Sequence, residues 1–302
     1  MNNFQEQKHQ KHLTNTRTII TLVLLLVCLS FTANAQPMTT DLGSMFYLSS
    51  KTDYYVFSTK ANIHSAPKAD SQIIDQLKSG EAVQVKRTSI DFNNVYTSHG
   101  ITSPWAEIMY TSPSGEKSGY IWLANLAISE FKISNSRFLL GIDSRITKKA
   151  DNKKNYCDSD FNKYIFKGFV NDSLQITYSF LDNNFDTSFS EITIMSGMGL
   201  TNLKNIIRFG TLGEACGVPS NYYYFGWNGQ KIIPLPSRYE VGDAGSFHHS
   251  EKIIFPKEKG GKPNTIIKII ENYEFNEKKN DYVKTENKRK TFFWKGSGYI
   301  EN

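Results

Sequence analysis

The chain has 302 residues, which allows one large domain or two domains of ordinary size. Hydrophobic residues make up 39% and aromatic residues 13% of it, which excludes a globally disordered chain because such a composition can bury real cores. The formal net charge is +6, and this mild excess without a clustered basic face does not indicate nucleic-acid binding.

The first 35 residues have the order of regions that is typical of a secretory signal peptide. Residues 1–17 are polar and carry net positive charge, and residues 18–31 form an apolar run. Alanines then stand at positions 33 and 35, where a signal peptidase reads small residues. We therefore expect cleavage after Ala35 and a secreted or periplasmic protein.

Two alternatives to a cleaved signal peptide are open. An uncleaved anchor would need a longer segment, because residues 18–31 rise only about 21 Å as a helix, against a hydrocarbon core of about 30 Å. A lipidated N-terminus at Cys28 would need a small residue directly before the cysteine, where the chain has Val27. No later segment is long and apolar enough to span, so no membrane span is expected after cleavage.

Cleavage would lower the net charge only slightly. Residues 1–35 hold three of the 35 basic residues and one of the 29 acidic ones, so 32 basic and 28 acidic residues, a net charge of +4, would remain. This charge is compatible with anionic partners such as wall polymers but does not require them.

Between residues 54 and 128, short β-type runs alternate with turn residues, after a linker over residues 36–53. The strand candidates are residues 56–59, 73–77, 81–86, 105–109 and 119–123. Five short strands within about 75 residues favour a small barrel, since that length cannot form two packed sheets of long strands.

This segment resembles the bacterial SH3 domain family. The residues that carry the likeness are Ala61-Asn62-Ile63-His64-Ser65-Ala66-Pro67, Ile73 to Glu81, the strand at Trp105, and Gly119-Tyr120-Ile121-Trp122. At these places the family typically has Asn-Val-Arg-Ser-Gly-Pro, Ile…Leu…Lys-Gly-Glu, Trp-x-Lys-Val and Gly-Trp-Val stretches. The chain departs from the family in two ways: His64 replaces the usual Arg, and residues 88–104 form a longer loop. A changed loop can change or abolish the ligand that the family binds.

The resemblance implies a non-enzymatic binding module of the cell envelope. Its partner would be a cell-wall polymer such as peptidoglycan, or an envelope protein or peptide, and no cofactor is expected. Because exposed aromatic side chains stack on sugar rings and on peptides, the candidate ligand-binding residues are Tyr54, Tyr55, Tyr96 and Trp105. The alternative is that Trp105 and Trp122 belong to the core and the adjacent tyrosines line a strand.

Ser134-Asn135-Ser136 and the polar stretch over residues 147–155 mark a boundary zone, so a second linker is predicted over residues 131–155. β signals return over residues 156–302. Strands are expected at residues 161–170, 174–180, 191–195, 222–227, 230–233, 265–273 and 283–294, with turns at 181–184 and 228–229 and a short helix at 203–209. The order Phe-x-Trp-x-Gly occurs at residues 225–229 and 292–296, which resembles units of propeller-like or jelly-roll-like domains. The predicted fold class is therefore mainly β: a small SH3-like barrel over residues 54–130, followed by a larger antiparallel β domain, propeller-like or jelly-roll-like.

Two cysteines would remain after cleavage, Cys157 and Cys216. In an oxidising compartment such a pair normally forms a disulfide, which would stabilise the fold by about 4 kcal/mol in the chain-entropy model. The alternative is a catalytic thiol at Cys216 that acts with His248 or His249, as in an exported cell-wall hydrolase. The sequence around Cys216 does not match the Asp-Cys-Ser-Gly stretch of papain-like cell-wall peptidases, so the disulfide is favoured.

Residues 182–186 read Asp-Asn-Asn-Phe-Asp, which has the D-x-N-x-D spacing of a calcium loop. Thr187 stands where an EF-hand needs Gly, and Thr193 stands where it needs Glu. A hairpin turn is therefore favoured over a calcium site.

A dense polar cluster lies between Asp243 and Glu251. In a strand, His249 and Glu251 share a face and His248 points away, and a turn at Gly245 would bring Asp243 towards them. Asp243, His249 and Glu251 are thus the candidate zinc ligands, or an acid–base group. No known zinc spacing occurs among them, so ordinary loop structure without a metal is favoured.

The chain is basic again near its end, between Lys278 and Lys290. Acidic residues at Glu277, Asp281 and Glu286 interleave with these lysines. The pattern favours a solvated strand pair, and contact with an anionic polymer is the alternative.

Overall fold

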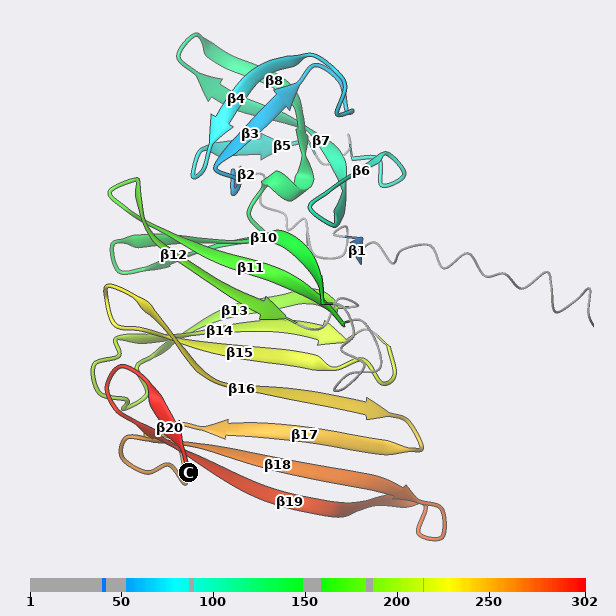
Figure 1. The fold of residues 1–302 in the computed structure, drawn as a ribbon, viewed down its shortest axis with the longest axis vertical. Helices are drawn as coiled ribbons and strands as arrows, with labels where there is room; N and C mark the ends of the chain where they lie inside the picture. The colour runs from blue at the N-terminus through cyan, green and yellow to red at the C-terminus, as the bar shows by residue number, and fades with distance from the viewer. Residues whose placement is uncertain (1–39, 42–52, 87–89, 149–158, 183–186, 214) are drawn as a thin grey trace, which may run out of the picture. The chain divides into compact units, whose positions relative to one another are not determined.

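The computed structural model describes residues 40–41, 53–86, 90–148, 159–182, 187–213 and 215–302 (Figure 1). Contacts along the chain place all the described residues in one unit. The predicted signal peptide with its cleavage site after Ala35, and the lipidation candidate Cys28, lie outside the described residues, as do Cys157 and most of the linker 36–53. No helix of the described part is long and apolar enough to cross a membrane.

The mainly-β fold class is confirmed, because strands that pair into three sheets make up most of the described chain. The first of these, which we call the N-terminal sheet, has the hydrogen-bonded order β2-β5-β7-β8-β3-β4, and β1 and β6 also pair with β7. Among the described strand pairs of this sheet, β1–β7 is parallel and the others are antiparallel. The strands are β1 (Thr40–Asp41), β2 (Asp53–Tyr55), β3 (Lys60–His64), β4 (Ile73–Lys78), β5 (Ala82–Val85), β6 (Val95–Ser98), β7 (Ile101–Ser112) and β8 (Gly115–Trp122), and the 3-10 helix η2 (Leu123–Asn125) follows them.

The described strands of the N-terminal sheet do not close into the expected barrel, because β2 and β4 stand at its two ends without pairing to each other. The strand expected at residues 56–59 is also wrong. Val56 makes only an isolated bridge with Leu126, and the backbone N–H groups of Phe57 and Ser58 both donate to the Asn125 carbonyl. Val56 instead exchanges backbone hydrogen bonds with Gly80 and Glu81, so residues 56–58 bond to η2 and to a turn rather than to a neighbouring strand.

Two strands occupy most of the segment that was expected to be a linker. The second sheet has the order β12-β11-β10-β9, with β9 (Ser129–Ile133), β10 (Ser136–Lys148), β11 (Ser159–Val170) and β12 (Ser173–Asp182). Residues 138–142 of β10 form a continuous apolar run because both faces of this strand are covered. Leu139 packs with Phe57 and Phe169, and Phe138 and Leu140 pack in the main core.

The third sheet is a meander of eight strands in which each strand pairs with the next in the sequence. The strands are β13 (Thr187–Ser196), β14 (Asn205–Gly213), β15 (Ser220–Trp227), β16 (Ile232–Asp243), β17 (Phe247–Ile254), β18 (Thr265–Asn276), β19 (Asp281–Trp294) and β20 (Tyr299–Glu301). A jelly roll would need crossed connections and a propeller would need separate four-stranded blades, so neither of the two expected architectures is present in the described strands.

Two local expectations for this region are wrong. Residues 203–209 were expected to be a short helix, but most of them lie in β14, where the adjacent Ile206 and Ile207 are both fully buried on opposite faces. Because β14 is covered on both faces, its apolar residues do not alternate along the strand, and their spacing resembles that of a buried helix. The hairpin expected across residues 181–184 is absent too, since β12 and β13 belong to different sheets.

The hairpin around Asn228 and Gly229 is confirmed, with Trp227 and Ile232 as its last pair. Gly229 has a φ of +102°, which glycine adopts without strain.

Aromatic side chains pack the second sheet against the third. The ring of Phe180 on β12 lies 4.8 Å from that of Phe225 and 5.5 Å from that of Phe209, and Tyr164 on β11 lies 5.0 Å from Phe209. At the edge of this core the fully buried Asp182 accepts hydrogen bonds from Asn221 Nδ2 at 2.9 Å and from the Tyr223 hydroxyl at 2.6 Å. Asp182 therefore ties the two sheets together, and the rest of the calcium-loop candidate, residues 183–186, lies outside the described residues.

Candidate functional site

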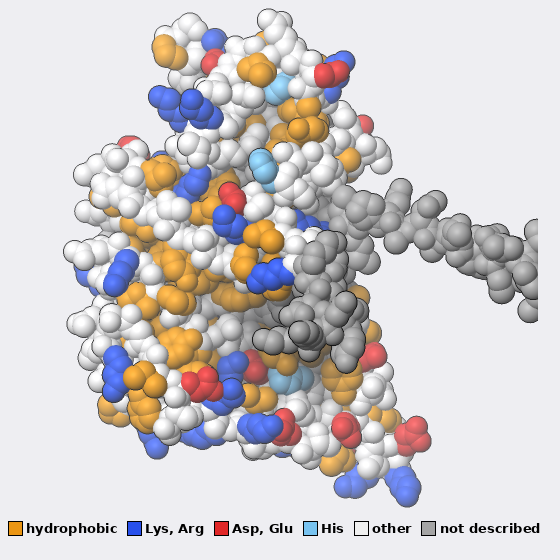
Figure 2. Space-filling view, viewed as in Figure 1, with side chains coloured by type: hydrophobic (Ala, Val, Ile, Leu, Met, Phe, Trp, Pro, Cys, Tyr) orange, Lys and Arg blue, Asp and Glu red, His pale blue; other side chains and the backbone are white. Residues whose placement is uncertain are grey.

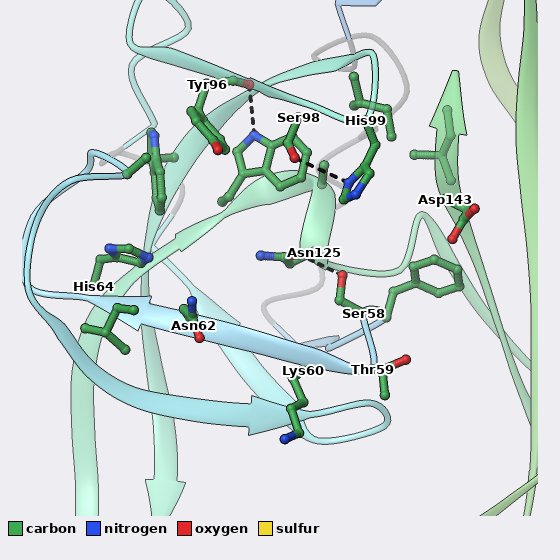
Figure 3. Close-up of a pocket in the computed structure, with 18 of the residues that line it drawn as sticks. Ser58, Thr59, Lys60, Asn62, His64, Tyr96, Ser98, His99, Asn125 and Asp143 are labelled. Carbon is green, nitrogen blue, oxygen red and sulfur yellow. Dashed lines mark hydrogen bonds between the residues drawn. The ribbon is translucent and has the colours of Figure 1, made fainter. Parts of the chain in front are cut away.

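A hollow of about 460 Å³ lies where the N-terminal sheet meets β10 and β11, and we call it the groove (Figure 3). Its volume is within the range of about 300–1,000 Å³ that is usual for small-ligand pockets. Tyr96, Ser98 and His99 lie on one side of it, and Asn62 and His64 lie on the other (Figure 3).

One wall of the groove is aromatic. His64 meets the face of Trp105 edge-on at 5.1 Å between ring centroids, and Tyr96 lies 6.0 Å from Trp105 and 5.6 Å from Trp122. The indole N–H of Trp122 donates to the carbonyl oxygens of Tyr96 and Ser103, which fixes its ring. Trp105 and Trp122 are buried and Tyr96 is 38% exposed, so the two indoles support the wall and the phenol faces the ligand space.

Amide groups form a second, polar part of the lining. The Ser58 hydroxyl donates to Asn125 Oδ1 at 2.7 Å, and Gln76 Nε2 donates to Asn62 Oδ1 at 2.9 Å. Both amide oxygens are thereby occupied, whereas the Nδ2 groups of Asn62 and Asn125 have no hydrogen-bond partner within the described chain. The NH2 groups of two oriented amides thus remain for a ligand.

Charged groups stand at the end of the groove next to the second sheet. Lys167 is buried, donates to the carbonyl oxygen of Phe57 and lies over the Phe57 ring, 4.5 Å from its centroid. Burial lowers the pKa of the Lys167 ammonium, against the opposite effect of the nearby Asp143 carboxylate. Asp143 itself is exposed and accepts from Lys163 at 3.0 Å. This end therefore presents charges of both signs.

The long segment before β7 forms one lip of the groove because it folds into the β6–β7 hairpin. His99 and Gly100 make the turn with φ values of +52° and +73°. The His99 carbonyl accepts from the backbone N–H of Arg145 on β10, which ties this hairpin to the second sheet. The long loop, which departs from the bacterial SH3 pattern, is thus part of the groove.

The four residues predicted to bind the ligand do not lie together. Tyr96 and Trp105 both line the groove. Tyr54 and Tyr55 lie on β2 outside it, and their side chains point to opposite faces of this strand. Tyr54 packs against the main core, and Tyr55 packs with Phe57 and under the Arg137 guanidinium.

Several groove residues were not predicted. His64 was noted in the sequence only because it replaces the usual Arg of the bacterial SH3 pattern. Trp122 was noted only as a candidate core residue, and neither was predicted to line a ligand site. No sequence signal pointed to Asp143 or Lys167, because they come from the segment expected to be a linker and from the next strand of another sheet.

The metal-ligand candidates are only partly brought together. His249 and Glu251 share a face, with His249 Nε2 at 3.7 Å from Glu251 Oε1. Glu251 instead accepts from Lys268 Nζ at 2.7 Å, and His249 Nδ1 lies at hydrogen-bond distance from Asn272 Oδ1. Asp243 stands at the β16–β17 turn, and no three His, Cys, Asp or Glu side chains of the described part come together as a metal site.

Cys216 is exposed in the loop between β14 and β15 and forms no disulfide with a described residue. Its predicted disulfide partner, Cys157, lies outside the described residues, so the bridge stays a prediction. The rings of the two candidate catalytic histidines pack elsewhere, His249 on Tyr239 at 4.3 Å and His248 beside Tyr273 at 6.0 Å.

Most of the basic run near the C-terminus lies on β19, and three of its six basic residues form ion pairs. Lys284 binds Glu271, Lys288 binds Glu286 and Lys290 binds Glu301. In Figure 2, basic and acidic side chains accordingly lie intermixed over the lower strands of the view. This arrangement agrees with the solvated strand pair.

Comparison of the chain with protein-family models and with curated proteins finds no match.

Proposed function

We propose that this chain is an exported, non-enzymatic binding protein whose groove takes a cell-envelope ligand, a peptidoglycan fragment in the first place. The observation that carries the proposal is the pairing of the half-exposed Tyr96 with free amide donors from Asn62 and Asn125 across one hollow. Aromatic faces suit the apolar face of a sugar ring, and oriented N–H groups suit the carbonyls of N-acetyl groups and peptides.

Two features of the sequence support the cellular setting in this proposal. Residues 1–35 have the composition of a signal peptide, and residues 54–128 resemble the bacterial SH3 family, whose members are often attached to envelope proteins. The mixed charges of Asp143 and Lys167 at one end of the groove suit a ligand that carries both a carboxylate and an ammonium group, as peptidoglycan stem peptides do.

The test is a binding titration of soluble peptidoglycan fragments with the chain from residue 36 onward, at low salt. The Tyr96→Ala substitution should weaken binding about tenfold, because it removes one stacking ring worth about 1 kcal/mol together with its buried area. Tyr299→Ala is the matched control, since Tyr299 is also 38% exposed but lies on β20 away from the groove.

Absence of binding at low salt, where charge attraction is strongest, would count against the proposal. Equal affinities of the Tyr96→Ala protein and the unmodified chain would remove the groove as the site. Binding of peptides from an envelope extract without binding of peptidoglycan fragments would replace the ligand class and keep the groove.

A further inference from the structure

A second hollow, of about 420 Å³, lies where the turn of the β16–β17 hairpin meets the β18–β19 hairpin, and we call it the cup. Hydrogen bonds join the two hairpins here: the Gly245 N–H donates to the Tyr282 hydroxyl at 2.9 Å, and the Phe275 N–H donates to the Ser246 carbonyl at 2.8 Å. The cup is therefore built from segments that are held to each other.

The cup exists because one residue of its floor has no side chain. Gly242 pairs with His248 across the hairpin, and His248 pairs with Tyr273 on β18, so the three residues lie in one row on the same face. A Cβ atom at Gly242 would lie 3.2 Å from His248 Nδ1, and a larger side chain there would extend into the space of the cup. Gly242 is not in the left-handed region, so its backbone conformation does not explain the glycine.

The aromatic walls of the cup are held in place. The Tyr273 hydroxyl donates to Glu271, and the Lys284 ammonium lies 5.3 Å from the centre of the Tyr273 ring. Tyr282 accepts from Gly245 and meets Phe275 edge-on at 5.4 Å. These rings keep their positions without a ligand, which lowers the entropy cost of binding one.

The polar groups of the cup are free to bind. Within the described chain, the side chains of Asp243, His248 and Ser250 have no hydrogen-bond partner, and all three line the cup. A carboxylate, an imidazole and a hydroxyl next to fixed phenol rings form the set of groups that recognises a polyhydroxylated ring: its C–H face packs on the aromatics and its hydroxyls take the donors and acceptors.

The charge of the cup selects among such ligands. Asp243 is its charged lining group, and none of the described lining residues is Lys or Arg. The nearby Lys284 is paired with Glu271. An anionic sugar would therefore be repelled, and we infer that the cup binds a neutral saccharide unit, at a site separate from the groove.

The experiment is saturation-transfer NMR and calorimetry with the chain from residue 36 onward, using triacetylchitotriose and maltotriose as probes. We expect at least one of them to bind. Gly242→Val should lower its affinity tenfold or more by filling the cup, and His248→Ala, a change at an exposed residue, should also lower it. Gly298→Val is the matched control, because a Cβ atom there meets nothing within 4 Å.

Each other outcome overturns the inference. No saturation transfer from either probe means that the cup does not bind neutral saccharides. Equal affinity of the Gly242→Val and Gly298→Val proteins places the saccharide elsewhere. Loss of the saccharide in Tyr96→Ala but not in Gly242→Val assigns it to the groove, which supports the proposed function and removes the cup.

Discussion

Glu251 is the residue whose side chain holds together the β16–β18 region. Its buried carboxylate accepts from Lys268 Nζ at 2.7 Å and from the Tyr239 N–H at 3.0 Å. Glu251→Ala should lower the free energy of unfolding by about 3 kcal/mol, because it leaves the half-buried Lys268 ammonium and a backbone N–H without their acceptor. Urea unfolding measures the change.

The control for this prediction is an ion pair of the same type at the surface. Lys290 and Glu301 are joined at 2.7 Å, but their side chains are 47% and 49% exposed. Glu301→Ala should therefore change the free energy of unfolding by less than about 1 kcal/mol. Similar losses in both variants would show that burial does not set the value of the Glu251 contacts.

The same residues show what the sequence can predict at this scale. Strand alternation correctly places His249 and Glu251 on one face and His248 on the other. Alternation does not predict that Lys268 forms an ion pair with Glu251. Glu251 lies on β17 and Lys268 on β18, and the register between these two strands decides which of their residues meet. A cluster that resembles a metal site in one strand becomes an ion pair when the next strand is added.

Among the elements, β10 connects the stability of the fold to the groove. The ring of Phe57 lies directly against Gly141 of β10, so a Cβ atom at Gly141 would overlap it. Gly141→Ala should displace Phe57, whose carbonyl and ring both hold Lys167 in the groove. We expect a loss of about 2 kcal/mol in the free energy of unfolding, from overpacking, together with weaker binding of the groove ligand.

Thermal unfolding and the peptidoglycan titration check this pair of effects. Gly298→Ala is the matched control, since that glycine has open space around its missing Cβ atom, and it should change neither property. A Gly141→Ala protein that unfolds and binds like the unmodified chain would show that Phe57 moves aside without disturbing Lys167.

Strands with one covered face were predicted better than strands with two. β5 alternates between exposed and buried residues, and Val83 and Val85 were placed on one face from the sequence. β10 and β14 instead have buried residues on both faces, so their apolar residues do not alternate. The spacing of apolar residues in β14 does not distinguish a strand from a helix, which explains that error. The linker was predicted from the polar residues around 134–136 and 147–155, and the apolar residues 138–142 between them were given too little weight.

At the scale of the whole molecule, the groove was predictable only in part. Tyr96 and Trp105 come from one segment with a recognisable pattern. Lys167 reaches the carbonyl of Phe57 across 110 residues of sequence, and this contact depends on how the second sheet packs against the first. Such a contact follows from the tertiary arrangement and has no local sequence signal.

Burial of tyrosines across the whole fold leads to a prediction about alkaline pH. Burial is the main cause that raises the pKa of at least five tyrosines in the described part: Tyr110, Tyr164, Tyr178, Tyr222 and Tyr223. For Tyr110 burial and a hydrogen bond to Asp75 raise the pKa to about 12 from its ordinary value of 10.0.

Below about pH 10 these phenols are protonated in the folded and the unfolded chain alike, so their contribution to stability is fully present. Above it the unfolded chain releases protons that the folded chain retains, so the free energy of unfolding should fall steadily from about pH 10 towards pH 12. Phenolate absorbance and far-ultraviolet circular dichroism, recorded in one titration, measure both events. We expect a fraction of the tyrosines to ionise only as the strand signal is lost, because Tyr164 and Tyr223 lie in the core between two sheets and cannot be charged there. Ionisation of all tyrosines near pH 10 with an unchanged strand signal would contradict the buried aromatic core itself.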